Sequence, residues 1–220
     1  MKILICLLHK ELLLEWRQKY ALNGILLYTS STIFICYSVF ILNGGGISPL
    51  AWNALFWIVV LFSAINTIAK SFLQENPSRN YYYYMITNPI ALIVSKIIYG
   101  SFLMVIVSFL ALGLYSLLLG NPVEDHAIFA LNLILGSIGF TSSLTMISSI
   151  ASKAGSNTML MAILSFPVLI PMILLVLRVS KNALDGLPPS TSLEEILTLI
   201  ALNVIVIALA LLLFPYIWRN

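Results

Sequence analysis

Six long apolar runs, separated by short polar breaks, fill almost the whole of the 220-residue chain. Hydrophobic residues make up 60% of the chain and charged residues 9%, so no water-soluble core could enclose these runs. Hydrocarbon admits only a backbone whose amides are bonded within the segment, and a helix of about 20 apolar residues crosses it. The sequence therefore predicts an all-α polytopic membrane protein.

The predicted spans form a single transmembrane domain over residues 1–220. They are residues 23–42, 50–73, 91–119, 127–151, 157–179 and 193–216. Basic residues in short loops are held on the cytoplasmic side during insertion. Arg178 and Lys181 fall on the far side, whereas the N-terminal side carries Lys2, Lys10, Arg17, Lys19, Lys70, Arg79, Lys96, Lys153 and Arg219. We therefore expect both termini in the cytoplasm.

The segment before the first span, residues about 3–20, mixes apolar residues with charged ones. This pattern predicts an amphipathic helix in the cytoplasmic interface, with its cations toward anionic membrane lipid. The candidate residues of this interfacial helix are Glu15, Trp16 and Arg17. A plain hydrophilic lead-in to the first span is the alternative, because basic flanks are common.

The most informative polar stretch is the predicted cytoplasmic loop between the second and third spans, residues about 74–90. Pro77 and Pro89 punctuate it, because proline restricts the preceding residue and starts helices well. Residues 78–87 are predicted to form a short helix. The four successive tyrosines within it cannot all face one side, so some face lipid headgroups and others are free for a protein partner. An interfacial aromatic belt without a partner is the alternative.

Several chemistries are disfavoured. There are no paired carboxylates, no nucleophile–base constellation and no metal-spaced histidine cluster, so we do not expect an enzyme. No P-loop motif and no region long enough for a nucleotide domain are present, so ATP and Mg²⁺ would be bound by another chain. No span carries Asp or Glu at membrane depth, which disfavours ion coupling. We expect no cofactor in this chain and no nucleic-acid partner.

His126 begins the fourth span on the outer side, beside Glu124 and Asp125. An imidazole beside two carboxylates is a candidate ligand for a metal or haem iron. One histidine does not make a site, and a solvated loop residue is the favoured interpretation. Cys6 and Cys36 lie on opposite sides of any membrane entry, so no disulfide between them is expected.

Polar residues within the spans support two interpretations, which are helix packing and a translocation path. Interhelical hydrogen bonds and close approach through Gly136 and Gly139 would explain them without a substrate. Pro167 and Pro171 are predicted to bend the fifth span. The polar residues are Asn66, Thr67, Asn132, Thr141, Ser142, Ser143, Thr145, Ser148, Ser149 and Asn203.

The chain resembles the CcmB family, also called haem exporter protein B, over nearly its whole length. The similarity rests on KELLLEWRQKYALNGILLY near the start and on SFLQENPSRNYYYYMITNPIALIVSKIIYG around the loop. It also rests on LGSIGFTSSLTMISSIASKAGSNTMLMAILSFPVLIPMILL and on a final span that ends IWRN. The chain departs from the family pattern in the loop, where Glu75 is the lone acidic residue and tyrosines follow.

The resemblance implies a six-span permease of the ABC-2 exporter kind in the bacterial cytoplasmic membrane. It implies coupling of ATP hydrolysis by a separate CcmA-like ATPase to haem export, or to release of the haem-loaded periplasmic chaperone. CcmC-, CcmD- and CcmE-like proteins would be its other partners, with haem present in the wider complex. The alternatives are an ABC-2 permease for a lipid, drug or glycan, and a non-transporting scaffold. The candidate coupling residues are Gln74, Glu75, Asn76, Arg79, Tyr81, Tyr82, Tyr83 and Tyr84.

Overall fold

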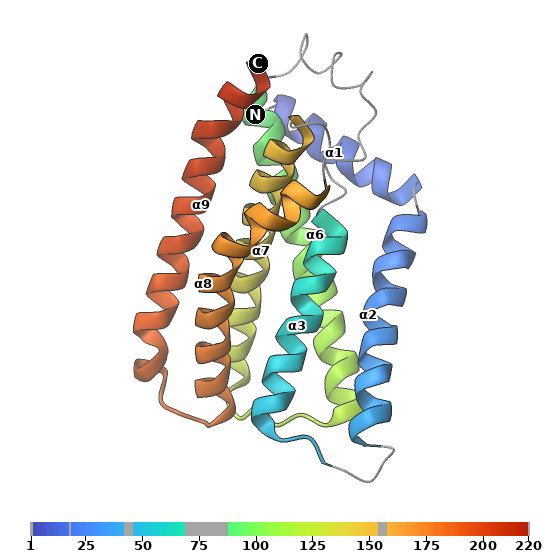
Figure 1. Cartoon of the computed structure of the whole chain (residues 1–220), viewed down its shortest axis with the longest axis vertical. Helices are drawn as coiled ribbons and strands as arrows, with labels where there is room; N and C mark the ends of the chain where they lie inside the picture. Colours follow the sequence, from blue (N-terminus) through green and yellow to red (C-terminus); the bar gives the residue numbers. More distant parts are fainter. Residues whose placement is uncertain (1, 18, 42–45, 69–87, 154–157, 220) are drawn as a thin grey trace.

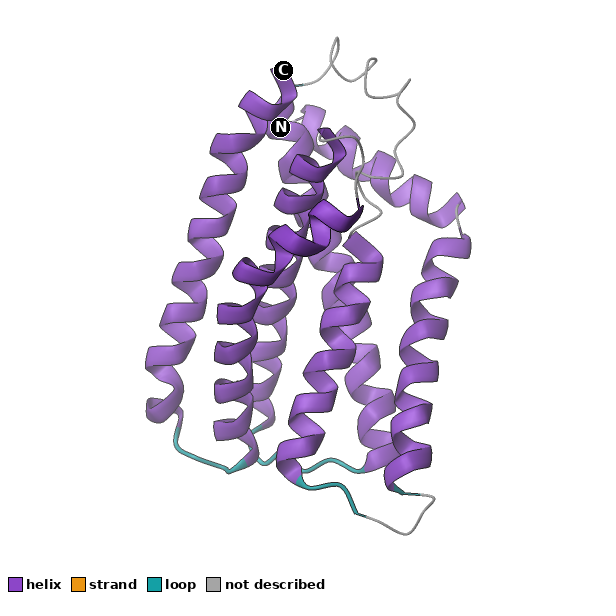
Figure 2. Ribbon diagram, viewed as in Figure 1, coloured by secondary structure: helices purple, strands orange, loops and turns teal. Residues whose placement is uncertain are grey.

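The computed structural model describes residues 2–17, 19–41, 46–68, 88–153 and 158–219, and the regular structure in these residues is entirely helical (Figure 2). The helices are α1 (Lys2–Arg17), α2 (Lys19–Phe40), α3 (Pro49–Ile68), α6 (Pro89–Leu119), α7 (His126–Lys153), α8 (Thr158–Leu184) and α9 (Leu193–Arg219), with a 3₁₀ turn, η1 (Pro189–Ser192), before α9. All except α1 and η1 are long and apolar enough to cross a membrane. The prediction of an all-α polytopic membrane protein is confirmed.

The six long helices run side by side, and both chain termini lie at the same end of the bundle (Figure 1). This follows from the even number of crossings. The last turn of α3 and the first turn of α6 lie at that end too, whereas η1 lies at the opposite end (Figure 1). Helix α1 lies across the end that carries the termini, oblique to the other helices (Figure 1).

Helix α6 begins where its sequence favours a helix start. Asn88 is the N-cap, with its side-chain oxygen accepting a hydrogen bond from the Ile90 amide at 3.1 Å, and Pro89 occupies the first helical position. Residues 89 and 90 of the predicted loop therefore belong to α6. Its 31 residues extend about 46 Å, more than the roughly 30 Å hydrocarbon layer requires.

Helix α7 is the centre of the bundle and packs against α3, α6, α8 and α9. Small residues let its neighbours approach the backbone closely. A Cβ built on Gly136 would lie 2.9 Å from the Trp57 ring and 3.2 Å from Val176. Glycine at this position therefore permits the contact of α7 with both α3 and α8.

An aromatic cluster fills the bundle near the end opposite the termini. Trp52 and Phe56 of α3 stack with ring centroids 5.6 Å apart, and Tyr115 of α6 meets Trp52 edge-on at 4.9 Å. The Trp52 indole N–H donates to the Gly120 carbonyl at 3.0 Å, just beyond the end of α6. Buried aromatic side chains thus join α3 to α6, and Phe129 of α7 packs against the same rings.

Helix α8 contains Pro167 and Pro171, and its ribbon changes direction in its N-terminal half, which holds both prolines (Figure 1). Proline removes a backbone donor and clashes with the preceding turn, which bends a helix. The predicted bend is confirmed.

Candidate functional site

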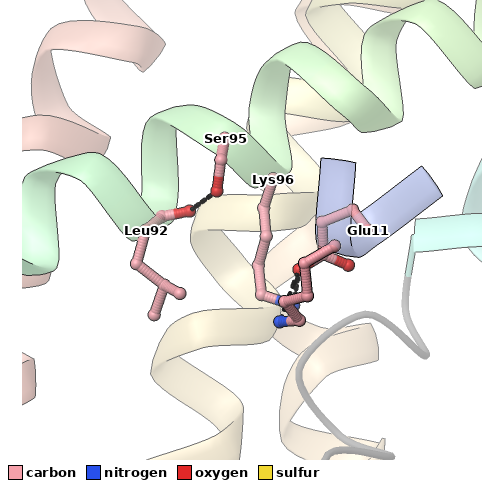
Figure 3. Close-up of polar contacts among 5 residues, drawn as sticks. Glu11, Leu92, Ser95 and Lys96 are labelled. Atoms are coloured by element: carbon pink, nitrogen blue, oxygen red, sulfur yellow. Dashed lines mark hydrogen bonds and ion pairs between the residues drawn. The ribbon is translucent and has the colours of Figure 1, made fainter. Parts of the chain in front are cut away.

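An ion pair joins α1 to α6 at the end of the bundle that carries the termini (Figure 3). Lys96 Nζ lies 3.6 Å from Glu11 Oε1, and the Lys10 ammonium lies 3.0 Å from the same oxygen. The Lys96 side chain is 2% exposed and that of Glu11 is 13% exposed. We call Glu11 and Lys96 the α1–α6 junction.

The buried position of Lys96 explains why its ammonium lies beside a carboxylate. Lys96 lies about two turns into α6, or about 10 Å along the axis from Pro89. Lysine is almost never fully buried without a partner, because a buried charge loses its hydration. The Glu11 carboxylate offsets that loss. The junction therefore places Glu11 of α1 against the side of α6 that carries Lys96.

The residues predicted for coupling are only partly within the described structure. The loop residues Gln74 to Tyr84 lie outside it. Glu15, Trp16 and Arg17 fall in the last turns of α1, and the side chains of these three residues are not described. The structure thus places the backbone of the predicted interfacial helix and leaves the predicted contacts with an ATPase untested.

A second polar region lies inside the bundle along α7. Asn132 is fully buried, and its amide donates to the Val176 carbonyl at 2.8 Å and to the Ser180 hydroxyl at 2.7 Å, both on α8. The Ser180 hydroxyl also accepts from the Trp57 indole of α3 at 2.6 Å. One polar cluster thus joins three helices. We call the buried polar residues of α7 the α7 polar core; they are Asn132, Ser137, Thr141, Ser142, Ser143, Thr145, Ser148 and Ser149.

Two further asparagines reach across helix contacts. Asn203 of α9 donates to the Leu135 carbonyl of α7 at 3.1 Å, and Asn53 of α3 donates to the Leu177 carbonyl of α8 at 3.1 Å. These bonds confirm that polar residues connect the helices. The side-chain oxygens of Asn53, Asn132 and Asn203 accept no hydrogen bond from the described residues. The core therefore retains acceptor capacity that the described packing does not use.

We expect Asn132→Leu to destabilise the protein by about 1–2 kcal/mol, because interhelical hydrogen bonds in membranes contribute about 0.6 kcal/mol on average and this residue makes two. The matched control is Asn66→Leu. The Asn66 amide donates to the Phe62 carbonyl of its own helix at 3.0 Å, so its loss should change the free energy of unfolding by less than about 0.5 kcal/mol. Unfolding in a denaturing-detergent titration measures both. Equal effects would contradict a connecting role for Asn132.

The sequence candidate His126 lies at the end of the bundle opposite the termini, at the start of α7. His126 is exposed, and its Nε2 lies 3.1 Å from the Asn121 amide nitrogen. Asp125 instead caps α7 by accepting from the Ala127 and Ile128 amides. Among the residues that the structure describes, no three His, Cys, Asp or Glu side chains gather as metal ligands would. His9 lies on α1, at the other end of the bundle from His126.

Sequence reasoning missed the α1–α6 junction. It counted Lys96 as one of the basic residues that orient the protein, and it did not single out Glu11. The available signal was the position of Lys96 inside an apolar run, since an ionisable residue within a span faces protein or water.

The fold and its two polar regions define the class of this protein. It is a multi-pass membrane protein with a helix across one end of a six-helix bundle. The family model of the CcmB protein matches residues 2–216, and the chain belongs to the CcmB family. It is therefore a membrane permease component of the haem-export system of cytochrome c biogenesis, and not an enzyme by itself. No curated protein and no solved structure matches the chain.

Proposed function

We propose that this permease subunit lies in the bacterial cytoplasmic membrane and relays ATP-driven motion from a separate CcmA-like ATPase. In this proposal the ATPase binds ATP and Mg²⁺ and contacts α1 and the loop before α6. The motion serves haem export, or the release of the haem-loaded CcmE-like chaperone, with CcmC- and CcmD-like proteins as neighbours. Both termini and α1 face the cytoplasm.

One observation carries the proposal: α1 lies across the end of the bundle where α6 begins, and Glu11 ties it to the buried Lys96 (Figures 1 and 3). A subunit driven from outside needs an element at its surface that is attached to its spans. Helix α1 also exposes the apolar side chains Ile5, Leu12 and Leu13, which suits a helix in the membrane interface.

Copurification tests this function. We expect the detergent-solubilised protein to recover a CcmA-like ATPase and a CcmC-like protein, identified by mass spectrometry. Replacement of Tyr81 to Tyr84 by alanine should abolish ATPase recovery, because the aromatic rings are the proposed contact. Replacement of the same residues by phenylalanine keeps the rings and should preserve recovery if the hydroxyls are not required.

Asp185→Ala is the matched control, because Asp185 is exposed at the opposite end of the bundle. It should leave ATPase recovery unchanged. Recovery of an unrelated ATPase would favour an ABC-2 permease for a lipid, drug or glycan. Absence of any ATPase would contradict the proposed coupling. Partner binding that persists in variants without any ATP-linked output would exclude a scaffold that only recruits proteins.

A further inference from the structure

Two contacts of α6, one helical turn apart, connect α1 to the centre of the bundle. The first is the ion pair of Lys96 with Glu11 of α1 (Figure 3). The second is at Gly100, four residues further along α6, which places it on the same side of the helix. A Cβ built there would lie 2.8 Å from Thr141 of α7 and 3.0 Å from Ile68 of α3.

At Gly100, helix α6 packs closely against α7 and α3. Gly100 and Thr141 are both buried, and Thr141 belongs to the α7 polar core. Close-packed interiors have low compressibility and transmit displacement. A movement of the first turns of α6 must therefore displace α7 or α3.

Of the contacts between α1 and α6, the ion pair is the one that other contacts replace least well. Helix α1 also packs against α6, and its Leu7 side chain is buried, but apolar contacts are not directional and allow sliding. A buried ammonium needs its carboxylate at one place. The pair therefore fixes α1 in register with α6.

We propose that Glu11 and Lys96 are the positioning residues that make α1 and α6 move as one unit, so that displacement of α1 reaches α7 through the Gly100–Thr141 contact. The inference rests on the proposed function, because it assigns the route by which the ATPase acts. A second part of the inference does not depend on the ATPase: the ion pair holds α1 against the bundle.

The first experiment needs no partner. Hydrogen–deuterium exchange of the purified protein in lipid nanodiscs compares the wild type with Glu11→Gln, Lys96→Met and the double variant Glu11→Gln/Lys96→Met. We expect all three to raise the exchange of α1 amides by about tenfold or more. In the double variant, exchange in α7 and the thermal midpoint should stay near wild type, because an apolar side chain replaces the buried cation.

Lys10→Gln is the matched control. It removes the other ammonium beside Glu11, but Lys10 lies on α1 itself and its pair with Glu11 does not join α1 to α6. We expect α1 exchange within about twofold of wild type, since partly exposed pairs between adjacent residues contribute little. Unchanged α1 exchange in the double variant would overturn the proposal.

The second experiment adds the recovered ATPase. The double variant should bind it as the wild type does and lose most of the ATP-linked output, which a role in stability alone would not produce at an unchanged thermal midpoint. Full ATP-linked output in a double variant whose α1 amides exchange faster than wild type would overturn the proposed route. If even the wild type recovers no ATPase, the proposed function fails, and the exchange measurement still decides whether the pair holds α1.

Discussion

Replacement of Gly139 by valine should destabilise the bundle by about 2–4 kcal/mol. A Cβ at this buried position would meet the Asn203 side-chain oxygen and would lie 3.2 Å from the Met172 sulfur. Overpacking of this kind costs about 1–3 kcal/mol. The substitution would also displace Asn203 from the Leu135 carbonyl, which removes a hydrogen bond between α9 and α7. Denaturing-detergent titration of the solubilised protein measures the free energy of unfolding.

Gly113→Val is the control for this prediction. Gly113 lies within α6 and is exposed, and a Cβ there would meet nothing within 4 Å. Valine has a somewhat higher helix propensity than glycine, so the expected change is within about 0.5 kcal/mol. If both valine variants unfold at the same detergent concentration, α7 and α9 do not approach as closely as the structure has them.

Replacement of Trp52 by alanine should cost about 3–5 kcal/mol, the range for truncating a large buried aromatic side chain. Trp52 is fully buried and contacts Phe56, Tyr115 and Phe129. Alanine would leave a cavity between α3 and α6 and would remove the bond from the indole to the Gly120 carbonyl. The free energy of unfolding and the yield of monodisperse protein measure the loss.

Phe102→Ala tests whether burial, rather than aromatic character, sets this cost. The Phe102 side chain on α6 is 62% exposed, so its truncation removes few protein contacts. The expected change is about 0.5 kcal/mol. Trp52→Phe should fall between the two, because it keeps one ring and loses the indole donor. A Phe102→Ala effect as large as that of Trp52→Ala would indicate that Phe102 contacts another chain.

The class of fold was predictable because it depends on an average property of long segments. Any run of about 20 apolar residues must be helical in hydrocarbon, whatever its neighbours are. The bend in α8 was also readable, because proline acts on its own helix. The similarity to the CcmB family was visible in local motifs and is confirmed by the match over residues 2–216.

The candidate site was less predictable, because the sequence does not show which apolar residues face other helices and which face lipid. Phe56 and Phe102 are both apolar residues within predicted spans, yet Phe56 is fully buried and Phe102 is largely exposed. In hydrocarbon, lipid-facing and protein-facing positions carry the same residues, so hydrophobicity does not distinguish them. The predicted loop residues lie outside the described structure, and their role in coupling stays a prediction.

By itself, the sequence determined that this protein is a six-span helical membrane protein of the CcmB family, since length and hydropathy are sufficient for the first and local motifs for the second. Only the tertiary structure decided that Lys96 is buried against Glu11, that Gly100 lies against Thr141, and that Asn132 joins α7 to α8. Each of these is a contact between segments distant in the chain, and the distance and burial that give it meaning exist only once the helices have packed.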